Sequence, residues 1–293
     1  MVQACHAARS VTKATTPATT WPGTVICVDY WTDDRLLMLL TDAADAVVDA
    51  LAGHTDWSLV DSGRGQYVAD LVADAAALGV LDAAGVGVVS EESGRRRADQ
   101  VATVVVDPLD GSTNASRGVP WYATSLAAVV DGEVRVAVVA DLANHRRYEA
   151  VAGHGATRNG QPITPSKVTE PRSAMIGLSG YPPAYLGWRQ FRAMGAVALD
   201  LCAVADGTLD GYMDCSWDAH GVWDYLGAML VCSEAGAVVA EAAGRNLVTL
   251  DPTDRRTPVA GGTIELAHAL VERRCSFSTP GEAEAAAGSP SDR

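Results

Sequence analysis

One junction in the chain constrains the fold more than any other part. Residues 101–106 read VATVVV, and residues 107–114, which follow at once, read DPLDGSTN. A run rich in β-branched residues predicts a buried β-strand. Pro108 fixes its own φ and Gly111 allows a close backbone approach, so the chain is expected to turn here. The sequence therefore predicts a buried strand that ends in two carboxylates three residues apart.

Helical and strand patterns alternate on both sides of this junction. Apolar residues at helical spacing predict helices, and short apolar runs predict strands. The pairs Asp131-Gly132 and Asn159-Gly160 predict tight turns. The expected helices span 36–51, 68–81, 195–206, 223–235 and 263–274, and the expected strands span 85–89, 101–106, 124–130, 134–139, 148–152, 209–213 and 238–241. This interleaving predicts an α/β protein with layered structure and two halves that meet at a cleft.

The ends of the chain differ in composition from its middle. Residues 1–24 are polar and Thr-rich and are expected to form a flexible arm rather than a signal peptide. Residues 276–293 are small and polar and are expected to be a disordered tail. The folded domain is expected over 30–275, with halves of about 30–155 and 156–275. No apolar run approaches the roughly 18 residues of a membrane span, so we expect a cytoplasmic protein without a membrane partner.

Charge and cysteine content exclude some classes of function. The chain carries 22 basic and 36 acidic residues, a formal charge of −14. Such a surface repels phosphate backbones and argues against a nucleic-acid polymer as partner, while it suits divalent cations. No C-x-x-C pair occurs, which argues against zinc. The six cysteines are expected to be reduced thiols, mostly buried: Cys5, Cys27, Cys202, Cys215, Cys232 and Cys275.

Four acidic segments are candidates for chemistry. Asp107 and Asp110 offer the hard oxygen ligands that Mg²⁺ prefers, although a helix-capping turn explains a bare D-x-x-D-G as well. Glu91 and Glu92 follow an expected strand and offer a ligand and a base, or form a solvated loop opposite Arg95–Arg97. The third segment is Trp223-Asp224, where an Asp at the start of a helix is also explained as an N-cap, and Trp217-Asp218 competes for the same role. The fourth is Asp70 with Asp74 one turn later, which are expected to be exposed carboxylates on a helix.

Together these segments resemble the inositol monophosphatase family of metal-dependent phosphatases, and the chain looks like a divergent bacterial-type member. DPLDGSTN is similar to the first family signature, Asp-Pro-x-Asp-Gly-Thr/Ser-x-Asn. Asp224 lies ten residues before the Glu of Glu234-Ala235-Gly236, as in the second signature, and this offset favours Asp224 over Asp218. Residues 195–200, 206–212 and 159–163 resemble further family segments. The resemblance covers about residues 65–270, in the family's order.

The resemblance implies a fold and a set of roles. The fold would be the layered α-β-α-β-α sandwich of the inositol monophosphatase / fructose-1,6-bisphosphatase type, commonly a homodimer and lithium-sensitive. Two or three Mg²⁺ ions would be held by Glu91, Asp107, the Leu109 carbonyl, Asp110 and Asp224. Glu91 with Ser112 would activate the attacking water, and Asp70 would help to hold the weaker third ion. The substrate would contact Gly111, Ser112, Thr113, Val197 and Asp214.

The expected activity is therefore Mg²⁺-dependent hydrolysis of a small phosphate monoester by direct attack of metal-activated water. A 3′(2′),5′-bisphosphate nucleotidase, a histidinol-phosphate phosphatase, a sugar (bis)phosphate phosphatase and a non-catalytic metal-binding descendant remain open. The chain departs from the family pattern at 67–70, where the usual Thr is missing, at 225–228, at Ala237, and between 214 and 223, where three extra residues stand. Arg95–Arg97, Arg146-Arg147, Arg189 and Arg192 form no clear basic pocket, so a monophosphate is preferred over a bisphosphate.

Overall fold

The structure is a computed structural model, and it describes residues 30–60, 65–216 and 218–278. The described residues from Trp31 onward form one compact unit. The expected arm over 1–24 lies outside the described residues, as does most of the expected tail. The first tail residues are placed, however. Ser276 is the C-cap of the last helix and Phe277 packs against the core, so the folded part extends beyond 275.

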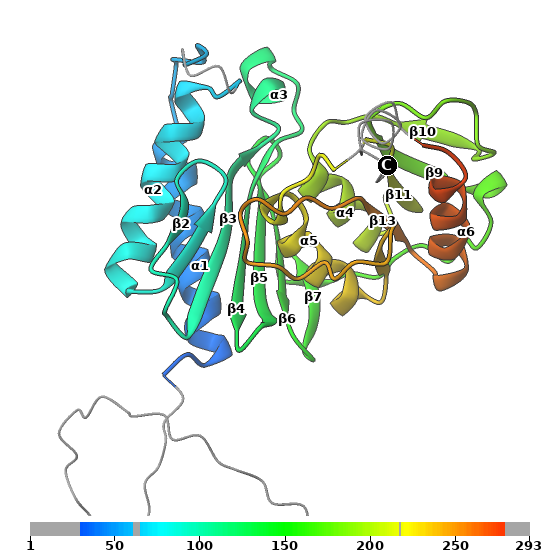
Figure 1. Ribbon diagram of the computed structural model, residues 1–293. Coiled ribbons are helices and arrows are strands. Elements are labelled where there is room, and N and C mark those ends of the chain that lie inside the picture. The colour runs from blue at the N-terminus through cyan, green and yellow to red at the C-terminus, as the bar shows by residue number, and fades with distance from the viewer. Residues whose placement is uncertain (1–29, 61–64, 217, 279–293) are drawn as a thin grey trace, which may run out of the picture. The chain divides into compact units, whose positions relative to one another are not determined.

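In the described part of the chain, two β-sheets and six α-helices are arranged in layers (Figure 1). Helices α1 (Asp33–Leu51) and α2 (Val68–Ala84) cover one face of the first sheet. Helices α4 (Val197–Ala205) and α5 (Val222–Ala235) lie between the two sheets, and α6 (Ile264–Cys275) covers the outer face of the second. This order of layers confirms the expected α-β-α-β-α sandwich.

The first sheet has eight strands in the order β2-β1-β3-β4-β5-β6-β7-β8. Its strands are β1 Gly87–Ser90, β2 Gly94–Arg96, β3 Ala102–Asp110, β4 Ala123–Val130, β5 Glu133–Asp141, β6 Arg146–Val151, β7 Gly155–Arg158 and β8 Gln161–Pro162. All neighbours are antiparallel except β1 and β3, which run parallel. Because β1 and β3 end at the same edge, the residues that follow them are brought side by side.

The second sheet has five strands in the order β10-β9-β11-β13-β12. Its strands are β9 Met175–Ser179, β10 Gln190–Arg192, β11 Gly211–Asp214, β12 Val238–Glu241 and β13 Pro258–Gly261. Short helices α3 (Ser112–Arg117) and η1 (Pro171–Ser173) complete the described structure. The sequence patterns missed β2, β7, β8, β9, β10, β13 and α3. These elements are short, so they carry too few residues to show a period.

The two predicted tight turns close hairpins. Asp131 and Gly132 have φ of 53° and 81°, and they join β4 to β5. Asn159 and Gly160 have φ of 51° and 72°, and they join β7 to β8. Two successive residues with positive φ form the turn whose twist matches that of paired strands. The sequence signal was therefore sufficient at both places.

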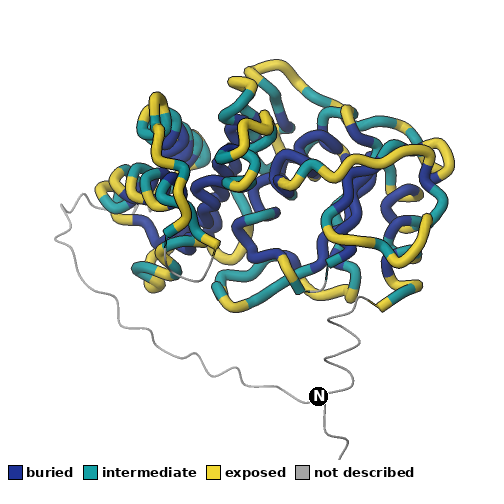
Figure 2. The backbone as a smooth tube through the Cα atoms, turned by 90° about the horizontal axis from the view of Figure 1, so that it is seen from above, coloured by how far each residue is buried: buried dark blue, intermediate teal, exposed yellow. Residues whose placement is uncertain are grey.

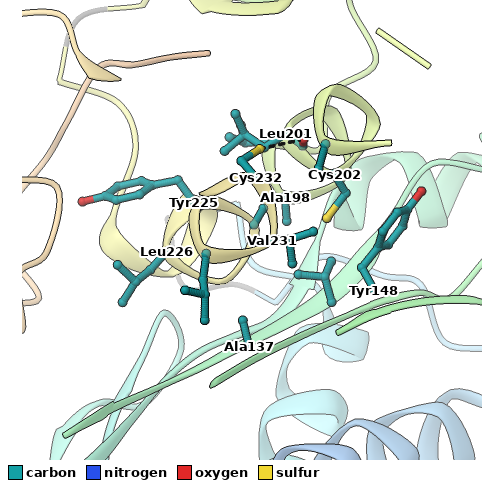
Figure 3. Packing of buried hydrophobic residues seen from close by; sticks show 14 of the residues in the cluster. Ala137, Tyr148, Ala198, Leu201, Cys202, Tyr225, Leu226, Val231 and Cys232 are labelled. Carbon is teal, nitrogen blue, oxygen red and sulfur yellow. Dashed lines mark hydrogen bonds between the residues drawn. The ribbon is translucent and has the colours of Figure 1, made fainter. Parts of the chain in front are cut away.

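The largest apolar core lies between the sheets. Leu226 and Val231 of α5 and Leu201 of α4 pack there against Ala137 and Tyr148 of the first sheet (Figure 3). The Cys232 thiol donates to the Leu201 carbonyl over 3.1 Å and so ties the two helices together. Figure 2 shows that the buried residues run through the sheets and the central helices, while exposed residues lie on the outer helices and loops.

Gly227 is the residue that lets α5 lie close to the first sheet. A Cβ at this position would stand 2.8 Å from the Ser125 hydroxyl and 3.2 Å from the Leu126 carbonyl. A larger residue would therefore push the helix away from β4. This close approach matters because the first turn of α5 carries Asp224 toward the end of β3.

Candidate active site

The parallel pairing of β1 and β3 fixes the position of Glu91, the first acidic residue of the site. Ser90 pairs with Val106, and the Glu91 amide donates to the Val106 carbonyl over 3.2 Å. Glu91 is therefore held beside the residue that precedes Asp107. The Ser90 hydroxyl donates to the buried Asp74 carboxylate over 2.5 Å, which anchors the end of β1 to α2. The position of Glu91 thus depends on hydrogen bonds from two neighbouring elements.

A β-bulge explains how Asp107 and Asp110 converge. Residues three apart in a regular strand point to opposite faces. Asp107 pairs with Ser125 and Asp110 pairs with Ala123, so β3 contains one residue more than β4 over this stretch. The extra residue restores a common side. The predicted strand therefore continues through the motif to Asp110, and the turn that the sequence suggested is a bulge inside the strand.

The backbone after the bulge turns sharply at Gly111. Its φ of +84° lies in the left-handed region, and a Cβ would stand 3.0 Å from the Trp121 carbonyl. Only glycine fits both requirements without strain. Asn114 then donates from its side-chain amide to the carbonyls of Trp121 at 2.8 Å and Met194 at 2.7 Å. Asn114 therefore holds the loop against the segment that precedes α4.

Asp224 comes from the start of α5. The N-cap of this helix is Gly221, and Asp224 is the third helical residue, so the expected N-cap role is wrong. Asp218, its competitor, forms an ion pair with Arg245 over 2.9 Å. Glu234, ten residues after Asp224, accepts hydrogen bonds from the Gly153 and Gly155 amides over 2.9 Å each. That Glu is structural, because it fixes the turn between β6 and β7.

Three of the predicted ligands form a cluster suited to a cation. Glu91, Asp107 and Asp224 each place one carboxylate oxygen within 4.8 Å of the others. At this spacing the repulsion between two ionised groups is on the order of 3 kcal/mol at an effective dielectric constant of 20. Oδ2 of Asp107 is buried without a hydrogen-bond partner. An orphaned carboxylate oxygen of this kind fits a metal ligand, and an all-oxygen donor set suits Mg²⁺.

Burial and mutual repulsion raise the pKa values of the clustered carboxyl groups. Burial raises the pKa of Asp107 well above its usual range, and the charges of Glu91, Asp110 and Asp224 add to the effect. Burial, then Asp224, raises the pKa of Asp110 to about 8, although the Ala198 amide donates to it over 2.7 Å. Glu91 is exposed as a residue, but its carboxyl group is largely surrounded by protein. Desolvation of that group, followed by repulsion from Asp224, Glu92, Asp110 and Asp70, raises its pKa to about 9.

Asp110 also has a structural task. α4 begins after Ala196 and has no side-chain cap of its own. The Asp110 carboxylate accepts the Ala198 amide and so satisfies one of the free N–H groups at the start of that helix. The same residue therefore connects the acidic cluster to the packing between the sheets.

His220 is a site residue that the sequence reasoning missed. Its Nδ1 lies 3.2 Å from Asp224 Oδ2 and its Nε2 lies 3.5 Å from Asp214 Oδ1. Burial lowers the pKa of His220, but the hydrogen bonds and charges of Asp214 and Asp224 outweigh burial and raise it to about 10. The available signal was a single His four residues before Asp224. It was overlooked because His220 lies in the stretch before Trp223 that has three extra residues compared with the family pattern.

Two expected substrate contacts do not fit the structure. Asp214 is completely buried and its Oδ1 accepts the Ser216 amide over 2.7 Å, so its visible role is to face His220. Val197 is 6 % exposed and belongs to the core between the sheets. Neither side chain offers a surface to a ligand in this conformation. Val197 precedes Ala198, whose amide donates to Asp110, and Asp214 faces His220, so both lie beside residues of the site.

Asp70 and Asp74 are buried, so the view of them as exposed helix carboxylates is wrong. Asp70 Oδ2 accepts the Tyr67 amide over 2.7 Å, while its Oδ1 is buried without a partner. Burial raises the pKa of Asp70 to about 6, the Tyr67 amide and the Ser112 hydroxyl lower it, and Glu92 raises it. Asp70 thus faces Ser112 beside the cluster. Ser112 is half-buried and Thr113 is exposed, and Leu109 is buried in β3.

A cavity opens next to the cluster. It measures about 580 Å³. Its walls include Asp70, Glu91 and Ser112 from the first half of the chain and the segment around Arg255 from the second half. This volume lies within the range of small-molecule sites in proteins. Glu91 of the cluster can therefore meet a small ligand that enters from solvent. Among the described helices none is long and apolar enough to cross a membrane.

The layered fold and the acidic cluster together define a protein that can hold a cation where two parallel strands end. The chain belongs to the inositol monophosphatase family, whose profile matches residues 66–276. The expected resemblance is therefore confirmed, and the relatives below support a phosphatase of this superfamily.

Curated relatives carry two kinds of name. The fructose-1,6-bisphosphatase/inositol-1-monophosphatase of Thermococcus kodakarensis is 34 % identical over 227 residues, which cover 75 % of this chain and 87 % of the relative. The Nus factor SuhB of Salmonella typhimurium is 30 % identical over 206 residues, which cover 62 % of this chain and 76 % of the relative. Among solved structures, a Pyrococcus horikoshii protein described by its similarity to inositol-1 monophosphatase has a TM-score of 0.72 at 28 % identity and covers 84 % of this chain and 98 % of its own.

Proposed function

We propose that this protein is a Mg²⁺-dependent phosphatase that hydrolyses a small phosphate monoester by direct attack of water. The observation that carries the proposal is the convergence of Glu91, Asp107 and Asp224 within 4.8 Å, with an orphaned Asp107 oxygen among them. Asp110 and the Leu109 carbonyl would complete the ligand set. Bound Mg²⁺ would neutralise the phosphate dianion and acidify water at this place.

Side chains and backbone groups of the protein would activate the water and bind the phosphate. Of the three cluster carboxylates, Glu91 is the one that lines the cavity, so it would accept the proton of the attacking water while the Ser112 hydroxyl orients that water. Asp70 faces Ser112 and would hold the hydroxyl in place and help to hold a third, weaker ion. The backbone of Gly111 and the residues Ser112 and Thr113 would bind phosphate oxygens. No Cys, Ser or His nucleophile is needed.

The test is phosphate release from a panel of esters with and without Mg²⁺. The panel contains inositol 1-phosphate, histidinol phosphate, fructose 1,6-bisphosphate, adenosine 3′,5′-bisphosphate and glycerol 2-phosphate. We expect Mg²⁺-dependent release from at least one ester. Asp224→Asn should abolish it, whereas Asp218→Asn, a change in the neighbouring Trp-Asp pair outside the cluster, should retain it. Equal activity of both variants would remove Asp224 from the site.

A second candidate is a non-catalytic descendant that binds metal or a protein partner. It is favoured by one observation, the similarity to proteins named Nus factor SuhB. It predicts that Mg²⁺ raises the melting temperature, that Asp107→Asn abolishes this rise, and that no ester of the panel is hydrolysed. Retention of every acidic residue of the cluster supports the enzyme instead.

The assembly and the location of the protein remain predictions. We propose a homodimer, which the resemblance implies, in the cytoplasm, where the cysteines are expected to stay reduced. Light scattering during size-exclusion chromatography measures the mass in solution. A mass near the 30.5 kDa of one chain would contradict the dimer.

A further inference from the structure

The cavity beside the cluster has one wall that the proposed chemistry does not use. Pro252, Thr253 and Arg255 line it from the loop between β12 and β13, together with Trp223 of α5. Figure 1 draws this loop in orange across α5 and the first sheet. Among the described residues that line the cavity, Arg255 is the only one with a positive side chain, whereas Asp70, Glu91 and Glu92 are acidic. The cavity therefore carries a cationic wall and an acidic wall.

Arg255 is held in place before any ligand arrives. Its guanidinium lies over the Trp223 ring, with Cζ 5.2 Å from the ring centroid. Its Nη1 donates to the carbonyls of Pro252 and Asp254, each over 2.9 Å. The next residue, Arg256, donates its amide to the His220 carbonyl over 2.9 Å, which fixes the loop to the segment before α5. A fixed planar guanidinium loses little side-chain entropy when it binds an anion.

Arg255 also lacks the carboxylate partner that its neighbours have. Arg245 pairs with Glu241 and Asp218, and Arg256 pairs with Asp254. No carboxylate of the described residues lies within ion-pair distance of Arg255, whose hydrogen bonds go to main-chain carbonyls. In a chain with a formal charge of −14, a fixed cation that faces a cavity without an acidic partner is suited to an anion from solution.

We infer that Arg255, stacked on Trp223, is a specificity residue that binds a second anionic group of the substrate, away from the reacting phosphate. The inference rests on the proposed phosphatase activity and narrows its substrate class. The reacting phosphate would be bound by the ions at the acidic cluster and by the backbone after Gly111, so Arg255 is available for another group. The favoured substrate is a small phosphate ester with a further phosphate or carboxylate. This reverses the preference for a monophosphate that followed from the arginine clusters visible in the sequence.

None of those arginines lines the cavity. Arg96 and Arg97 pair with Asp82, and Arg147 pairs with Asp45. Arg95 is exposed and does not line the cavity. Arg255 was overlooked because a single Arg in a polar loop has no sequence signature. Its contact with Trp223 joins residues 32 positions apart and exists only in the folded chain.

The experiment compares substrates that differ only in the second anion. Steady-state kinetics are measured with fructose 1,6-bisphosphate against fructose 1-phosphate, and with adenosine 3′,5′-bisphosphate against adenosine 3′-monophosphate. The proteins are wild type, Arg255→Met, Arg255→Lys and the exposed control Arg95→Met. We expect Arg255→Met to lower kcat/KM for the preferred bisphosphate about 10- to 100-fold, mainly through KM, because a charged partner is lost. Arg255→Lys should lower kcat/KM for the bisphosphate by a smaller factor, since lysine keeps the charge but lacks the planar guanidinium.

The monophosphate of the same pair decides the interpretation. We expect Arg255→Met to change kcat/KM for the monophosphate by less than about twofold. Arg95→Met should leave kcat/KM unchanged for both substrates. An equal loss on both substrates would overturn the inference, because Arg255 would then act on the reacting phosphate or on folding. Unchanged kinetics on the bisphosphate would overturn it as well.

A binding measurement separates this inference from the proposed activity. Calorimetry with each bisphosphate is run in Ca²⁺ instead of Mg²⁺, with wild type and Arg255→Met. Binding that weakens at least tenfold in the variant supports the Arg255 site even if no ester is hydrolysed, an outcome that would refute only the phosphatase. Equal binding to both proteins refutes the Arg255 site even if hydrolysis is observed.

Discussion

Asp110→Asn should stabilise the metal-free protein while it destroys the proposed activity. Asp110 is 9 % exposed and burial, with Asp224, raises its pKa from 3.8 to about 8. Between these two values the folded protein holds a proton that the unfolded chain has released. Because the folded pKa is the higher one, this contribution to stability is complete below about pH 4 and is lost as pH rises toward 8. An asparagine does not titrate, so the variant escapes this loss.

The magnitude follows from the slope of one proton. Stability changes by 1.36 kcal/mol per pH unit for each proton of difference. The gap between Asp110→Asn and wild type should therefore widen by about 3 kcal/mol between pH 5 and pH 7. In a domain of this size that corresponds to roughly 6–12 °C in melting temperature. The amide oxygen can still accept the Ala198 amide, so the start of α4 stays capped.

The assay is thermal unfolding followed by circular dichroism, in EDTA and in 10 mM Mg²⁺, from pH 5 to pH 8. In EDTA the variant should become the more stable protein as pH rises. In Mg²⁺ the order should reverse, because only wild type gains binding free energy. Asp131→Asn on the β4–β5 turn is the control, since asparagine tolerates its positive φ. Parallel pH slopes for wild type and Asp110→Asn would refute the reasoning.

Three further predictions address the cluster and its supports. Gly111→Ala should lower the free energy of unfolding by about 2–4 kcal/mol, because strain at φ +84° adds to a 3.0 Å contact with the Trp121 carbonyl. Gly132→Ala, which has positive φ but open space, should cost only about 1 kcal/mol in the same denaturant melts. His220→Gln should weaken Mg²⁺ binding about tenfold in calorimetry, since the His220 ring orients the Asp224 carboxylate. Unchanged affinity would contradict this role of His220. Millimolar Li⁺ should inhibit Mg²⁺-dependent phosphate release, and unchanged rates would count against the resemblance-based second ion site.

The positions of the main elements were readable from local pattern. The long helices at 36–51 and 68–81 and the paired hairpin strands appear where periodicity and turn residues predicted them. These signals act over a few residues, because a helix or a strand must bury one face whatever it packs against. The strands that escaped this reasoning have two to five residues. Their conformation comes from the neighbours with which they pair, which the local sequence does not name.

The composition of the acidic cluster was also suggested by the sequence, but its shape was not. The motif at 107–114 and the offset from Asp224 to Glu234 singled out the carboxylates. The bulge that brings Asp107 and Asp110 to one side depends on the register of β3 against β4. The burial of Asp70, the contact of His220 with two carboxylates, and the stacking of Arg255 on Trp223 likewise required the folded chain.

By itself, the sequence determined the layered fold class, the family and the residue types that can hold a cation, because these depend on local periodicity and on motifs a few residues long. The tertiary structure alone decided which carboxylates meet, which are too buried to meet a ligand, and which cation faces the cavity. The physical reason is that burial, pKa and contact distance are properties of neighbours in space. In this protein those neighbours come from segments as far apart as β1 and α5.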